Sequence, residues 1–232
     1  MNMYWKSRLV KKSYLYLTVS TYLAILTALA MAFLYAPTEK TMGDVQRIFY
    51  FHVPSAWASF VAFGVVAVAS ILFLRTGKNK WDMMAQSSAQ VGVMFLTLVL
   101  ITGPLWAKPV WNVYWTWDAR LTTSFILWLI FIAYLMLRSY VADKERGARF
   151  AAVFGIIGFL DVPIVYMSIR WWRTLHPSPV VGGGEGSGLA APMLQTLLVS
   201  VGAFTLLFIT LLVFRYKTAT LANQLELVKN RN

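Results

Sequence analysis

The chain has 232 residues, of which 59% are hydrophobic and only 13% are charged. An ordinary soluble domain carries about 25% charged residues, so this composition excludes that class and indicates a membrane protein. The formal net charge of +12 comes from short basic clusters between apolar runs. These clusters form no single basic patch or stripe, so we expect no nucleic-acid partner.

The sequence lacks cysteine and a nucleotide-binding phosphate loop, and each absence excludes a class of function. The sequence contains no cysteine, which excludes disulfides, thiol exchange, iron–sulfur ligation and Cys-x-x-Cys-His heme attachment. It also lacks a Gly-x-x-x-x-Gly-Lys-Ser/Thr phosphate loop. We therefore expect any ATP hydrolysis to come from a partner subunit.

Six apolar stretches approach or exceed the roughly 18 to 20 residues that a helix needs to cross a bilayer. We predict an all-α integral membrane protein, with residues 1–232 forming one polytopic domain. The first stretch is longer than the apolar region of a cleaved signal peptide, so we interpret it as an anchor helix. The spans are expected near residues 15–35, 54–74, 85–103, 122–138, 150–168 and 191–214.

The distribution of lysine and arginine predicts the orientation. An even number of spans puts both termini on one side, and fifteen of the 21 basic residues flank that side. The positive-inside rule makes that side cytoplasmic. The segments 36–53, 104–121 and 169–190 then face outward, and all the unusual residues lie in them.

Prolines and glycines suggest where these outer segments begin and how they connect. Pro54 and Pro104 lie at predicted span ends, where proline is tolerated or ends a helix. Gly182–Gly188 is typical of a flexible linker, and no strand precedes it as in a nucleotide-binding loop. We expect this linker to provide length and not chemistry.

The only two histidines, His52 and His176, both fall just outside predicted spans on the outer side. A lone histidine at a membrane interface more often anchors or hydrogen-bonds there. Two histidines from different segments, each beside aromatic residues, instead suit the two faces of one heme, whose iron accepts imidazole nitrogen axially. We predict that they are axial ligands of a heme iron.

Residues 106–120 carry four tryptophans and one tyrosine. Scattered Trp and Tyr side chains form belts at any membrane interface, but this density favours a platform on which a porphyrin face stacks. Asp118 is expected to organise the loop backbone. The predicted platform residues are Trp106, Trp111, Tyr114, Trp115, Trp117 and Asp118.

Charged residues on the outer side are candidates for contacts with the heme propionates, which require nearby cations. Each of them is equally compatible with an ordinary interfacial role. Asp161 lies inside the fifth span, where a carboxylate is costly, so we expect it to pair with Arg170 or to be protonated. The candidate cations are Arg120, Arg47, Lys108, Arg170 and Arg173.

The segment Trp111–Thr122 resembles the tryptophan-rich WWD signature of heme-handling proteins. Segments Gln46–Trp57, Gly103–Pro109 and Pro163–Pro177 resemble the cytochrome c maturation protein C (CcmC) group of that family, whereas the related CcmF and CcsA synthases are larger. Asn112-Val-Tyr-Trp115 departs from the Gly-Thr-Trp-Trp of many members, so a phenol replaces one indole.

The resemblance implies that heme b is held at the outer face of the bacterial inner membrane by the WWD residues and by His52 and His176. It further implies delivery to a membrane-anchored, CcmE-like heme chaperone during cytochrome c biogenesis. The implied partners are an ABC-type ATPase subunit (CcmA-like), a second membrane subunit (CcmB-like) and a small helper (CcmD-like). The chain would be a heme-handling component and not an enzyme.

Two alternatives remain open at this point. A WWD-type synthase component would help to attach heme to apocytochrome thiols, but such proteins normally have more spans and further histidines. A permease subunit for another hydrophobic or anionic substrate would use the Trp-rich loop as a gate. The permease alternative predicts a colourless protein in which His52 and His176 are dispensable.

Overall fold

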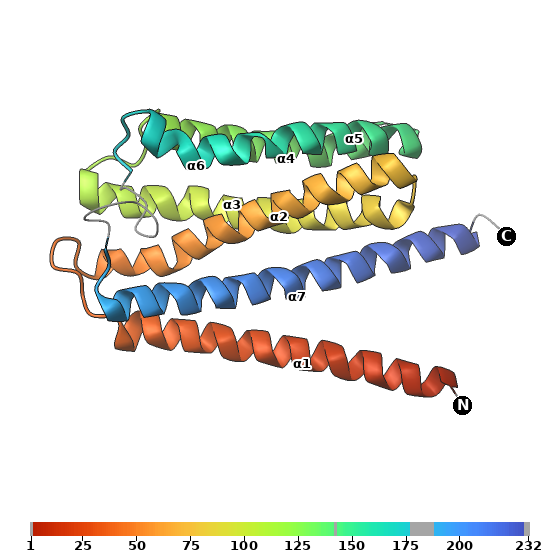
Figure 1. The fold of residues 1–232 in the computed structure, drawn as a ribbon, viewed down its shortest axis with the longest axis horizontal. Coiled ribbons are helices and arrows are strands. Elements are labelled where there is room, and N and C mark those ends of the chain that lie inside the picture. Colours follow the sequence, from red (N-terminus) through yellow and green to blue (C-terminus); the bar gives the residue numbers. More distant parts are fainter. Residues whose placement is uncertain (1, 142, 177–187, 230–232) are drawn as a thin grey trace.

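The fold is a bundle of helices whose axes lie roughly parallel to one line, with successive long helices running in opposite directions (Figure 1). The computed structural model describes residues 2–141, 143–176 and 188–229, and these contain no β-strand. Two short segments, a π-helical turn (Met31–Tyr35) and a 3₁₀ helix (Asp44–Ile48), accompany the α-helices. The α-helices are α1 (Asn2–Ala30), α2 (Phe49–Thr76), α3 (Asn79–Trp111), α4 (Ala119–Tyr140), α5 (Lys144–Phe159), α6 (Asp161–Trp171) and α7 (Ala191–Lys229).

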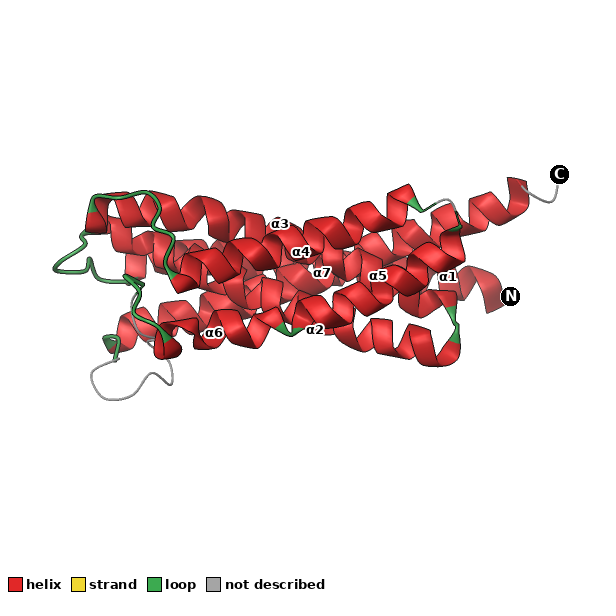
Figure 2. Ribbon diagram, turned by 90° about the horizontal axis from the view of Figure 1, so that it is seen from above, coloured by secondary structure: helices red, strands yellow, loops and turns green. Residues whose placement is uncertain are grey.

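Six helical stretches of the described chain are long and apolar enough to span a membrane, which confirms the predicted all-α architecture. Helices suit this environment because they pair their backbone N–H and C=O groups internally. The start of α1 and the end of α7 lie at one end of the bundle, and the connections after α1 and α3 lie at the other, with the end of α6 (Figures 1 and 2). Which end faces the cytoplasm stays a prediction.

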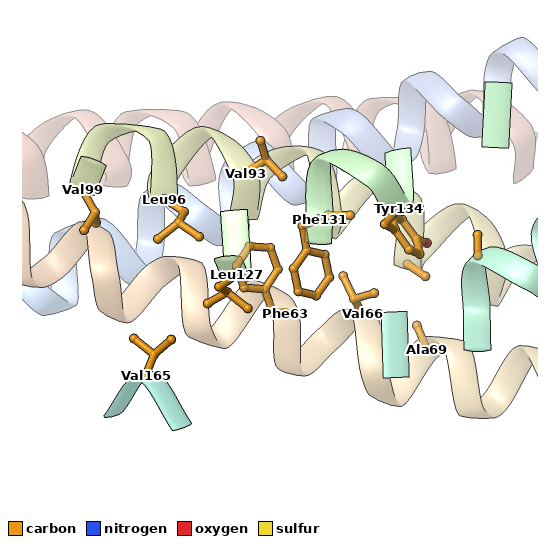
Figure 3. Close-up of a cluster of buried hydrophobic side chains, with 13 residues drawn as sticks. Phe63, Val66, Ala69, Val93, Leu96, Val99, Leu127, Phe131, Tyr134 and Val165 are labelled. Carbon is orange, nitrogen blue, oxygen red and sulfur yellow. The ribbon is translucent and has the colours of Figure 1, made fainter. Parts of the chain in front are cut away.

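The core lies where α2 packs against α3, α4 and α5, while α1 packs against α7 at the opposite side of the bundle (Figure 1). Phe63 of α2 stacks on Phe131 of α4 with ring centroids 3.7 Å apart, at the centre of the cluster drawn in Figure 3. A Cβ atom on Gly92 would come within 2.7 Å of the Phe63 ring. Glycine at that position therefore allows α3 to approach α2 closely.

The predicted helix boundaries at Pro54 and Pro104 are wrong. Pro54 lies inside α2, and α3 continues through both Pro104 and Pro109 to Trp111. Proline removes one backbone donor, and a transmembrane helix tolerates this where neighbouring groups satisfy the freed carbonyl. His52 consequently lies in the first turn of α2, and residues 104–111 of the predicted outer loop are helical.

The fifth span is a pair of helices, α5 and α6, that meet at Leu160. Pro163 cannot donate to the carbonyl of Phe159, so the regular hydrogen-bond ladder is interrupted there. Asp161 begins α6, and its Oδ2 is buried without a hydrogen-bond partner in the part of the chain that the structure describes. Of the predicted glycine linker, only Gly188 belongs to the described residues, and positions 182–187 lie outside them.

A buried ion pair fastens α3 to α4 at the end of the bundle that carries the termini. Arg138 donates through both terminal guanidinium nitrogens to the Asp82 carboxylate, with Nη2 and Oδ2 2.6 Å apart. The two side chains are only 14% and 8% exposed. Such a pair contributes little net stability when intact, but losing one partner leaves the other charge buried and uncompensated.

We therefore expect Asp82→Ala to lower the free energy of unfolding by about 3–5 kcal/mol. The matched control is Glu145→Ala, which removes the partner of Arg149 in a pair whose side chains are 72% and 53% exposed. That control should lose no more than about 1 kcal/mol. Denaturant unfolding in detergent measures both variants, and equal losses would contradict the assignment.

Candidate functional site

A cavity lies at the end of the bundle opposite the termini. The empty space between its walls measures about 820 Å³, a figure that includes open solvent. Its walls come from α2, α3, α4, the 112–118 connection and the segment after α6. The apolar part of the lining is formed by Ala56, Phe60, Leu96, Val99, Leu100, Pro104, Ala107, Val113, Leu121 and Leu175.

Both histidines of the chain line this cavity, although they come from distant segments. His52 projects from the first turn of α2 and is only 8% exposed. His176 is half-buried on the segment that follows α6, where its backbone N–H donates to Thr174 Oγ1 at 2.9 Å. The structure thus brings together the two predicted metal-ligating side chains.

The ring of His52 is held by one face of α3. Its Nδ1 lies 2.9 Å from Thr102 Oγ1, and its ring meets the Trp106 ring edge-on at 5.9 Å between centroids. A Cβ atom on Gly103 would lie 3.5 Å from His52 Cε1. Sequence reasoning missed Thr102 and Gly103 because it ended the third span there. Within α3, Thr102 and Trp106 are four residues apart and therefore lie on the same face of the helix.

Four of the predicted platform aromatics line the cavity: Trp106, Trp111, Tyr114 and Trp115. The indole N–H groups of Trp106 and Trp115 are buried without hydrogen-bond partners among the described residues. Trp117 is 73% exposed and does not line the cavity, although its ring packs edge-on against Trp115 at 5.6 Å. The platform therefore consists of an inner aromatic wall with one outward-facing indole behind it.

Asp118 also lies outside the cavity lining, and its contacts explain the shape of the loop. Its carboxylate accepts hydrogen bonds from the backbone N–H groups of Arg120 at 2.9 Å and Leu121 at 3.1 Å, and from the Thr116 hydroxyl at 2.8 Å. Asp118 is thus the N-cap of α4, which satisfies donors that a helix start leaves unpaired.

Asn112 ends α3 in the left-handed conformation, with φ at 58°. Glycine adopts this conformation without steric cost, and asparagine is the next most tolerant residue. Lys108 Nζ donates to the Asn112 carbonyl at 3.1 Å and to its Oδ1 at 3.0 Å. Asparagine at this position is therefore compatible with the turn that starts the 112–118 connection.

The five predicted cations, all within the described residues, occupy different surroundings. Arg120 lines the cavity and donates to the Val165 carbonyl of α6. Arg47 donates to the carbonyls of Ala32 and Ala36, which ties it to the π-helical turn that follows α1. Lys108 contacts Asn112 and the Tyr114 ring. The Cζ atom of Arg170 lies 5.7 Å from the centroid of the Tyr166 ring. Arg173 is exposed.

Comparison with known proteins identifies the family. The family model described as "Heme exporter protein C" (CcmC) matches residues 2–231. The chain belongs to the heme exporter protein C family. This membership confirms the resemblance inferred from the WWD segment and its companions.

Individual heme exporter protein C relatives agree with the family model. The chain is 42% identical over 176 residues to heme exporter protein C of Bradyrhizobium diazoefficiens, covering 76% of this chain and 67% of that protein. It is 34% identical over 183 residues to heme exporter protein C of Haemophilus influenzae, covering 79% and 74%. A putative cytochrome c biosynthesis ccmC-like mitochondrial protein of Arabidopsis thaliana is 32% identical over 212 residues, covering 90% and 79%.

The left-handed turn at Asn112 generates a stability prediction. Asn112→Val is expected to lower the free energy of unfolding by about 1–2 kcal/mol, because a β-branched side chain is strained at positive φ. Asn112→Gly should lose less, since glycine accepts the same backbone conformation. Unfolding curves in detergent compare the two variants, and a Val variant as stable as the Gly variant would show that the turn does not require this conformation.

Proposed function

We propose that this chain binds one heme in the cavity through His52 and His176 as axial ligands, and delivers it for cytochrome c biogenesis. The observation that carries the proposal is the convergence of the only two histidines of the sequence on one cavity. A heme iron accepts one imidazole on each face of the macrocycle. Two histidines from separate segments supply that ligand set.

The rest of the lining has the chemistry that heme requires. Trp106, Trp111 and Trp115 offer flat apolar surfaces for the macrocycle. Arg120 offers a guanidinium that can hold a propionate in a charge-assisted pair. The indole N–H groups of Trp106 and Trp115, which have no hydrogen-bond partner in the described part of the chain, add two donors for a polar part of the ligand.

The predicted orientation puts the cavity on the periplasmic side of a bacterial inner membrane. Six of the 21 basic residues belong to segments at the cavity end, and the others flank the end with the termini. The positive-inside rule therefore favours a cytoplasmic location for the termini. A periplasmic site is where heme would be transferred to an outward-facing partner.

The proposed partners follow from the family. The names of the bacterial relatives describe heme export, and the chain itself lacks a phosphate loop. We infer that a CcmA-like ATPase supplies ATP hydrolysis, with CcmB-like and CcmD-like membrane subunits beside it, and that a CcmE-like chaperone receives the heme. The outward-facing ring of Trp117 offers that chaperone an aromatic contact beside the cavity wall.

Absorption spectra of the purified protein with hemin test the two-histidine ligation. The parent should give a Soret band with the α and β bands of six-coordinate heme, whereas His52→Gly and His176→Gly should each lose the six-coordinate spectrum. Added imidazole should restore it by replacing the missing side chain. A parent that stays colourless, or a double variant with the parent spectrum, would overturn the proposal and favour a permease for another substrate.

The role of Arg120 is tested with two forms of the ligand. Arg120→Gln should weaken hemin binding about 10- to 100-fold, since a hydrogen bond to a charged group contributes about 1.5–3 kcal/mol. The same variant should bind hemin dimethyl ester, which lacks propionate charge, as well as the parent does. Titration by absorbance measures both.

The matched control for Arg120 is Arg173→Gln, because Arg173 is exposed and does not line the cavity. This variant should bind both ligands like the parent. If Arg173→Gln weakens hemin binding more than Arg120→Gln, the propionate contact is assigned to the wrong residue.

A further inference from the structure

We propose that Thr102 is a positioning residue that fixes the tautomer of His52, so that Nε2 is the ring nitrogen with a lone pair for the heme iron. This inference rests on the proposed heme-binding function and adds to it a residue that does not touch the iron. Thr102 projects from α3 and His52 from α2, so the contact joins two spans.

The hydrogen-bond geometry around Thr102 Oγ1 gives the direction of this contact. The hydroxyl lies 2.7 Å from the Leu98 carbonyl oxygen, which can only accept. A hydroxyl has one proton, and that proton is needed between these two oxygens. Towards His52 Nδ1, 2.9 Å away, the hydroxyl therefore accepts, and the imidazole donates.

This direction determines which nitrogen is free to bind metal. A neutral imidazole carries one ring proton, so a proton on Nδ1 leaves the lone pair on Nε2. Rotating the ring by half a turn would place carbon instead of nitrogen against the Thr102 hydroxyl, and would forfeit the hydrogen bond. The Trp106 ring meets this buried imidazole edge-on, and a Cβ atom on Gly103 would lie 3.5 Å from its Cε1.

A hydrogen bond of this kind also changes the strength of the ligand. An acceptor on the distal N–H of a metal-binding histidine fixes the ring orientation and raises the basicity of the coordinating nitrogen. A more basic ligand stabilises ferric over ferrous iron, so Thr102 should hold the heme midpoint potential lower than it would be without the hydroxyl.

The tautomer is measurable without heme, because the chain has only two histidines. Protein labelled with ¹⁵N in the histidine rings, in a His176→Ala background, shows only the two ring nitrogens of His52. At pH 8.5, NMR should find the proton on Nδ1, and in Thr102→Val it should move to Nε2. A parent spectrum with the proton on Nε2 overturns the inference.

The effect on heme is measured by hemin titration and redox potentiometry. Thr102→Val should weaken hemin binding about 10- to 100-fold and raise the midpoint potential, while Thr102→Ser should restore both values. The matched control is Thr97→Val on the same helix. Thr97 also donates to an i−4 carbonyl and accepts from a ring N–H, but its ring partner is Trp128, at 2.9 Å, and not a proposed iron ligand.

These measurements separate a failure of the inference from a failure of the proposed function. If Thr102→Val matches the parent in affinity and potential while His52→Gly loses the axial ligand, Thr102 has no positioning role and the heme site stands. If Thr97→Val shifts the potential as much as Thr102→Val, the effect is general loosening of α3 and the inference is wrong. If the parent binds no hemin, the proposed function fails, and the NMR experiment still decides the tautomer.

Discussion

Hydrocarbon accepts a polypeptide backbone only where its N–H and C=O groups are paired within the protein, and the rest of this structure depends on that constraint. It makes each span a helix and moves irregular backbone to the two ends of the bundle. At one end, the connection 112–118 and the segment after Trp171 lie beside the starts of α2 and α4. The open cavity lies among these segments, so the residues with metal-binding chemistry are held at one end of the bundle by helices that are themselves fixed by packing.

The two proposed ligands are held in different ways. His52 belongs to a helix, is buried, and contacts a hydroxyl and an indole of the neighbouring helix. His176 belongs to the connecting segment and is half-buried. The aromatic wall depends on two local devices, the left-handed turn at Asn112 and the Asp118 cap of α4. A helix cap contributes about 0.5–2 kcal/mol, so these devices can define the loop without help from the ligand.

Composition and hydropathy were sufficient to predict six spans and the gathering of the outer segments at one end. The two histidines that the sequence assigned to one site both line the cavity. Composition and hydropathy misplaced the helix ends, because α3 starts at Asn79 in a polar segment and continues through Pro104, although proline often ends a helix. They also treated five cations as equivalent, whereas backbone carbonyls engage Arg47 and the cavity includes Arg120. The pairing of Thr102 with His52 joins two helices, and no local pattern in the sequence specifies such a contact.

An experimental structure of the protein with hemin, in its complex with the partner subunits, would test the central claim most directly. The account predicts planar density in the cavity, with iron coordinated by His52 Nε2 on one face and His176 on the other, and with the macrocycle against the inner tryptophans. Density on the outward surface beside Trp117 and Trp171, with the cavity filled by side chains or water, would contradict it. In that case the two histidines would share a cavity for a reason other than holding iron.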